Sequence, residues 1–168
     1  SAIADPKPED ERLDGRNVVL LIDTSASMAA IDVSGGVDRL DIGRQKAREV
    51  LGTLGPLDNV MLVTMDGQLR PVTPFVKESA ILSQQIADLK TTATPADIGQ
   101  ALRFVRDAVR GKKEAELHVF SDGAFADDFN KAAEALPAQV KVKHHRTGES
   151  GANIAVTAFN ARRYIRNL

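Results

Sequence analysis

Carboxylate and hydroxyl side chains gather in three short segments of the sequence. They are residues 23–27 (Asp-Thr-Ser-Ala-Ser), residues 121–123 (Ser-Asp-Gly) and residues 91–97, which hold three threonines and one aspartate. Every potential ligand atom there is an oxygen, because the segments contain no His or Cys. Hard oxygen ligands in small number suit Mg²⁺ or Mn²⁺, with Ca²⁺ as a further candidate. The segments therefore predict a divalent cation site.

The spacing within residues 23–27 supports this prediction. In a loop that leaves a strand, alternate side chains at Asp23, Ser25 and Ser27 can turn toward one point. Asp23 and Asp122 would then supply the negative charge. Neutral hydroxyl ligands leave a cation electrophilic, so such a site is expected to accept a carboxylate from a partner protein in its open position.

Simpler interpretations of the same residues stay open. Asp23 and its serines can cap a helix, because Asp and Ser are preferred at such positions. Thr94 precedes Pro95 and can cap the next helix by accepting from the Asp97 amide, or it can bind the cation directly or through water. Asp66 precedes a glycine and favours a hairpin turn over a ligand.

The elements that must position these residues follow from hydrophobic patterning. Short, branched apolar runs at residues 18–22, 60–65 and 117–120 are typical of parallel strands covered on both faces. Residues 140–144 and 154–159 fit strands nearer an edge. Residues 69–72 are expected to return as an antiparallel hairpin strand, with Pro71 confining it to an edge or a bulge.

Between these runs the apolar spacing becomes helical. Apolar faces are centred on residues 47–54, 81–89, 98–109 and 129–136. Strands that alternate with helices predict an α/β fold with a doubly wound, mostly parallel central sheet, one antiparallel edge strand and helices on both faces. Ligands of such sheets bind beyond the carboxyl ends of the strands, where residues 23–27 and 121–123 fall.

Length and composition set the remaining limits. The chain has 168 residues, enough for about one domain, and a formal net charge of -1, which argues against a nucleic-acid binder. It has no cysteine, so thiolate metal sites and disulfides are excluded. No apolar run approaches the ~20 residues of a membrane span.

We expect a linker-like segment at residues 1–16, the domain at 17–161, and the start of a linker or further module at 162–168.

At residues 23–27 and 121–123 the sequence resembles the von Willebrand factor type A (vWA) domain, the Rossmann-like fold of integrin inserted domains. The metal-ion-dependent adhesion site (MIDAS) of that family has the pattern Asp-x-Ser-x-Ser, a distant Thr and a later Asp. Asp23, Ser25 and Ser27 match the first element, and Asp122 matches the last. The resemblance spans about residues 17 to 160.

The distant threonine departs from this pattern. In the family it stands six residues before an aliphatic residue of the following helix, a count that places Ala96 before Leu102. Ala96 has no ligand atom, so Thr94, two residues earlier, is the substitute. The resemblance thus implies the following metal ligands: Asp23, Ser25, Ser27, Thr94 and Asp122.

The resemblance also implies a function. The expected protein is a non-enzymatic, adhesion-type interaction module that binds a partner Asp or Glu through Mg²⁺, Mn²⁺ or Ca²⁺. Its ending is similar to bacterial membrane-anchored relatives of the aerotolerance (Bat) type, so a parent protein at the bacterial membrane, on the periplasmic side, is expected, with no direct membrane contact by this fragment. Two alternatives are a metal-free scaffold and a Mg²⁺-dependent phosphohydrolase with Asp23 as nucleophile, although the latter would need a second Asp at Ser25.

Overall fold

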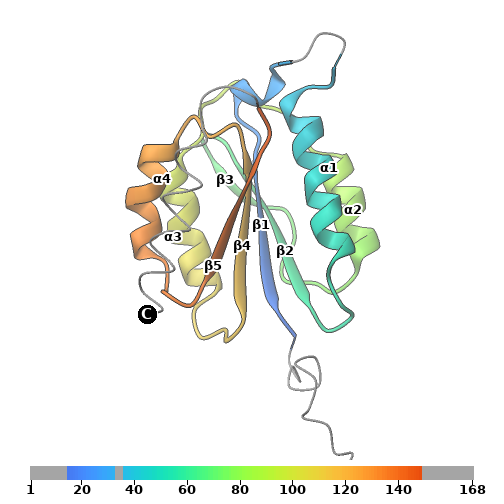
Figure 1. The fold of residues 1–168 in the computed structure, drawn as a ribbon, viewed down its shortest axis with the longest axis vertical. Helices are drawn as coiled ribbons and strands as arrows, with labels where there is room; N and C mark the ends of the chain where they lie inside the picture. Colours follow the sequence, from blue (N-terminus) through green and yellow to red (C-terminus); the bar gives the residue numbers. More distant parts are fainter. Residues whose placement is uncertain (1–14, 33–35, 149–168) are drawn as a thin grey trace, which may run out of the picture.

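A five-stranded sheet forms the centre of the computed structural model, which describes residues 15–32 and 36–148 (Figure 1). The strands are β1 (Asn17–Asp23), β2 (Asn59–Met65), β3 (Leu69–Pro71), β4 (Ala115–Ser121) and β5 (Lys141–Arg146). The helices are α1 (Arg39–Gly52), α2 (Ser79–Ala87), α3 (Ile98–Ala108) and α4 (Ala126–Ala132), with 3-10 turns η1 (Ala26–Ala29) and η2 (Ala133–Ala135).

The sheet order is β3-β2-β1-β4-β5. Strand β1 pairs in parallel with β2 and β4, β5 pairs in parallel with β4, and β3 is antiparallel to β2. Pro71 lies in the edge strand β3, where its missing N–H costs no ladder bond on the open side. These features confirm the predicted doubly wound, mostly parallel sheet. The predicted strand at residues 154–159 lies outside the described residues.

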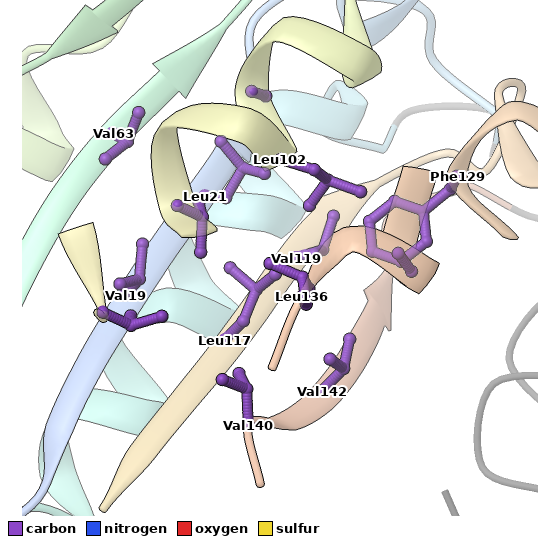
Figure 2. Close-up of a cluster of buried hydrophobic side chains, with 14 of the residues drawn as sticks. Val19, Leu21, Val63, Leu102, Leu117, Val119, Phe129, Leu136, Val140 and Val142 are labelled. Carbon is purple, nitrogen blue, oxygen red and sulfur yellow. The ribbon is translucent and has the colours of Figure 1, made fainter. Parts of the chain in front are cut away.

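Strand β1 explains why the chain needs helices on both faces. Residues 18–22 are fully buried, and they alternate between two hydrophobic clusters. Val19 and Leu21 pack on the side of α3 and α4, as Figure 2 shows, whereas Leu20 and Ile22 pack on the side of α1 and α2. A strand with two dry faces reads in sequence as a continuous apolar run, which is the pattern observed.

The start of α3 differs from the sequence expectation. Asp97, not Thr94, is the N-cap, and its side chain accepts a hydrogen bond from the Gln100 amide at 3.1 Å. The capping role predicted for Thr94 was therefore wrong. The physical reason is that the helix begins at Ile98, too far along the chain for Thr94, whose hydroxyl accepts instead from the Gly67 amide.

A histidine pair fills the junction of β4 and β5. His118 Nδ1 and His145 Nε2 are 2.9 Å apart, and the His145 ring stacks on Phe120 with ring centroids 4.6 Å apart. Burial, with a further contribution from the neighbouring His118, lowers the pKa of His145 from 6.5 to about 4. The folded domain therefore holds this ring neutral at pH values where the unfolded chain protonates it.

The buried, neutral His145 ring predicts that the β4–β5 side of the sheet is less stable at acidic pH. Because the unfolded chain binds the additional proton below about pH 6.5, the His145 contribution to the free energy of unfolding should decrease as the pH falls from 7 toward 4. Urea denaturation at several pH values should show a shallower decrease for His145→Gln than for the unmodified domain. Identical pH slopes in the two proteins would contradict the assignment, whatever their absolute stabilities.

Candidate functional site

Three buried carboxylates lie at the carboxyl edge of the sheet. Asp23 ends β1, while Asp66 and Asp122 directly follow β2 and β4, and their exposed fractions are 1%, 4% and 4%. The strand order reverses direction at β1, because the chain first adds β2 on one side and later β4 on the other. In sheets of this kind, the usual ligand position lies beyond the carboxyl ends of strands whose loops leave toward opposite faces.

The loop after β1 brings the side chains of Ser25 and Ser27 into contact. The Asp23 Oδ1 atom accepts a hydrogen bond from the Ser25 amide at 2.9 Å, which turns the chain sharply after the strand. The hydroxyls of Ser25 and Ser27 then lie 3.3 Å apart. Met28, in the η1 turn that follows, is fully buried and anchors the loop to the core.

The second oxygen of Asp23 is the unusual atom of the site. Asp23 Oδ2 is buried and has no hydrogen-bond partner within the described residues. Burial raises the pKa of Asp23 to about 6, and the nearby charges of Asp122 and Asp66 add to the rise, although the Ser25 side chain and amide lower it in part. A buried carboxylate oxygen without a donor carries a desolvation cost that a bound cation would remove. Asp23, Ser25 and Ser27 therefore fit a hard cation.

Asp122 is also in the expected place, but both of its oxygens already have donors. Its Oδ1 atom accepts from the Ala124 amide at 3.0 Å, and its Oδ2 atom accepts from Arg39 Nη1 at 3.0 Å. The backbone turns at Gly123, whose φ of 82° favours glycine. Asp122 thus contributes charge to the site, and that charge is paired with a guanidinium.

Thr94 lies beside the loop and connects three segments. Its hydroxyl accepts from the Gly67 amide at 3.0 Å and lies 3.1 Å from the Thr92 hydroxyl, while its carbonyl accepts from the Ala26 amide at 3.2 Å. These bonds hold the residue 23–27 loop against the loop after β2. Ala96 is half-buried and packs against the core near α3 and α4.

Sequence reasoning missed Arg39, and it favoured a hairpin turn over a ligand for Asp66. Asp66 does form the predicted hairpin turn, since its Oδ1 atom accepts from the Gln68 amide at 2.6 Å, but it also lies close enough to raise the pKa of Asp23. Its position directly after a buried parallel strand was the available signal. Arg39 had no comparable signal, because its partner Asp122 lies 83 residues away.

No group of three or more His, Cys, Asp and Glu side chains is placed to hold a metal ion anywhere in residues 15–32 and 36–148. The candidate metal ligands at this site differ from such a group, because two of them are the hydroxyls of Ser25 and Ser27. No helix in the described part of the chain is long and apolar enough to cross a membrane.

The fold and site together define a Rossmann-like α/β domain with an oxygen-rich site at the carboxyl edge of its central strands. The chain belongs to the von Willebrand factor type A domain family, whose model matches residues 18–124. Domains of this family are typically protein-interaction modules, usually without catalytic activity, and often bind a divalent metal at the MIDAS. None of the curated proteins matches the sequence.

Solved structures agree with this fold at low sequence identity. An aerotolerance-related membrane protein from Bacteroides fragilis has a TM-score of 0.68 at 16% identity, covering 89% of this chain and 88% of the other. BatB from Bacteroides thetaiotaomicron has a TM-score of 0.63 at 18% identity, covering 77% of this chain and 65% of BatB. The three N-terminal domains of the pilus tip protein Mfa5 from Porphyromonas gingivalis have a TM-score of 0.54 at 21% identity, covering 65% of this chain and 20% of the Mfa5 chain.

The buried charge of Asp23 is expected to lower the free energy of unfolding of the metal-free domain. Since the folded pKa is raised above the ordinary value of 3.8, the Asp23 contribution should reduce the free energy of unfolding as the pH rises from about 4 to 6. In EDTA at pH 7.5, Asp23→Asn should therefore be more stable than the unmodified domain, by up to about 3 kcal/mol. Chemical denaturation measures the difference, and the exposed Asp107→Asn serves as the control with little expected change.

An Asp23→Asn domain that is less stable in EDTA at every pH would contradict this account. That result would mean that the Asp23 carboxylate stabilises the loop through its bond to Ser25 more than its burial costs.

Proposed function

We propose that this domain is a cation-dependent protein-interaction module. Asp23, Ser25 and Ser27 bind Mg²⁺ or Mn²⁺, or Ca²⁺ in their place, with Asp122 and Thr94 beside the ion. A partner Asp or Glu completes the coordination shell. The observation that carries the proposal is the buried Asp23 Oδ2 atom, which has no hydrogen-bond donor in the described residues. The loop that follows this carboxylate holds the Ser25 and Ser27 hydroxyls 3.3 Å apart.

The charge balance supports a carboxylate as the outside ligand. Asp23 brings one negative charge and the hydroxyls bring none, while Asp122 shares the positive charge of Arg39 with Asp32. A divalent ion in such a set keeps net positive charge, and it attracts an anionic oxygen more strongly than a neutral one. A side-chain carboxylate of a partner protein meets this requirement.

A metal-free scaffold is the second candidate, and one observation favours it. Both Asp122 oxygens and the hydroxyls of Thr94, Ser25 and Ser27 already have hydrogen-bond partners, so four of the five expected ligands are engaged. An enzymatic role has less support. The hydroxyls of Ser25 and Ser27 lie against each other, and in the described residues neither has a histidine partner to remove its proton.

The setting of the parent protein is also part of the proposal. One structural neighbour is titled an aerotolerance-related membrane protein, and another is titled a membrane spanning protein from Vibrio fischeri. We assign this domain to a membrane-anchored bacterial parent, with the carboxyl edge of the sheet facing a partner on the periplasmic side.

Titration calorimetry with MgCl₂ and MnCl₂ tests the metal site. The unmodified domain should give a saturable signal, and Asp23→Asn should weaken binding at least about tenfold, since it removes a full ligand charge. Asp107→Asn, a matched loss of one carboxylate on exposed α3 surface, should bind as the unmodified domain does. The absence of any saturable signal in the unmodified domain would favour the metal-free scaffold.

The partner carboxylate can be tested with the Mn²⁺-loaded domain. Water molecules bound to Mn²⁺ increase the relaxation rate of solvent protons, so a ligand that replaces one lowers that rate. A short peptide with a central Glu should reduce the rate in a saturable manner, and the same peptide with Gln should not. Equal effects of the two peptides would contradict recognition of a carboxylate.

A further inference from the structure

Arg39, the first residue of α1, connects separate parts of the candidate site. Its Nε and Nη2 atoms donate to the two carboxylate oxygens of Asp32 at 2.8 and 2.7 Å. Its Nη1 atom donates to Asp122 Oδ2 at 3.0 Å and to the Ser27 carbonyl at 3.4 Å. The Arg39 side chain is only 14% exposed and its guanidinium contacts three groups, so it is a fixed part of the site rather than a solvated surface charge.

The geometry on Asp32 fixes where this charge lies. A bidentate ion pair between a guanidinium and a carboxylate restricts the orientation of both groups. A lysine could not reproduce this geometry. The Arg39 amide also donates to the Ala30 carbonyl at 2.9 Å. A backbone bond and a side-chain ion pair therefore both join the start of α1 to the segment after η1. The remaining Nη1 atom is thereby directed at Asp122 and the Ser27 carbonyl.

This placement changes the charge that a cation would meet. Arginine stays protonated at all physiological pH values, so the single positive charge of Arg39, which is shared with Asp32, compensates the negative charge of Asp122 in part before any ion binds. The affinity of oxygen-ligand sites for divalent ions depends strongly on the number of ligand charges. The Arg39 guanidinium also repels an ion placed next to Asp122.

We propose that Arg39 lowers the cation affinity of the site by partly compensating the charge of Asp122, so that the domain binds divalent ions weakly on its own. This inference rests on the proposed function, because it concerns the same site. It makes Arg39 a positioning residue: it orders Asp122 and the Ser27 backbone in the free domain, and it opposes the ion electrostatically. A partner carboxylate would then be needed to raise the occupancy of the ion.

The test compares Mn²⁺ binding to the unmodified domain, Arg39→Met and Arg39→Gln by calorimetry and by the electron paramagnetic resonance signal of free Mn²⁺. Both variants remove the charge, and Arg39→Gln keeps a polar group near Asp122. Each should bind Mn²⁺ about tenfold or more tightly than the unmodified domain. Arg44→Met is the matched control, because Arg44 lies on the same helix and pairs with Asp41 rather than with Asp122.

A second measurement separates charge from structure. In EDTA, both Arg39 variants should have a lower midpoint of thermal unfolding than the unmodified domain, because Asp32 and Asp122 lose their shared partner. Mn²⁺ should then raise the midpoint of the variants more than that of the unmodified domain. Asp32→Asn, which keeps the Arg39 charge but loosens its anchor, should change Mn²⁺ affinity less than either Arg39 variant does. Circular dichroism identifies a variant that fails to fold, and the other one then decides.

The outcomes distinguish this inference from the proposed function. Equal or weaker Mn²⁺ binding by folded Arg39 variants, with clear binding by the unmodified domain, would overturn the inference and leave the proposed function intact. Binding by the variants alone would support the inference, because the unmodified domain would then bind the ion too weakly to detect without a partner carboxylate. Binding by none of the folded proteins would overturn both.

Discussion

The burial of the Asp23 carboxylate is the constraint on which the site depends. Strand β1 is covered on both faces, so its last residue leaves the core at the centre of the sheet, between the ends of β2 and β4. Parallel pairing in register brings Asp66 and Asp122 to the same edge. The fold that stabilises the hydrophobic core thereby concentrates negative charge where solvent is scarce.

The surroundings of this charge are arranged in two different ways. On the β4 side, a guanidinium from α1 pairs with Asp122, and the carboxylate has a donor for each oxygen. On the β1 side, Asp23 has one amide donor, and its other oxygen has no partner in the described residues. The asymmetry separates the part of the site that is already stabilised from the part that is available to a ligand.

The fold and part of the site were predictable from local patterns. Continuous apolar runs predicted buried strands, helical spacing predicted the helices, and alternate polar residues predicted the contact between Ser25 and Ser27. The contact between Arg39 and Asp122 was not predictable, because charge pairing across 83 residues has no periodic signature. The cap of α3 was misassigned because Thr94 and Asp97 are both good caps, and only tertiary contacts decide between them.

The order of the strands has a consequence for how the domain is assembled during synthesis. Strand β1 is made first, but its neighbour on one side, β4, follows only after α3 has been made. The segment that carries Asp23, Ser25 and Ser27 therefore leaves the ribosome long before Asp122 can meet Arg39. Completion of the site therefore requires that β4 has joined β1, so a nascent chain that ends before β4 cannot present the whole edge to a partner.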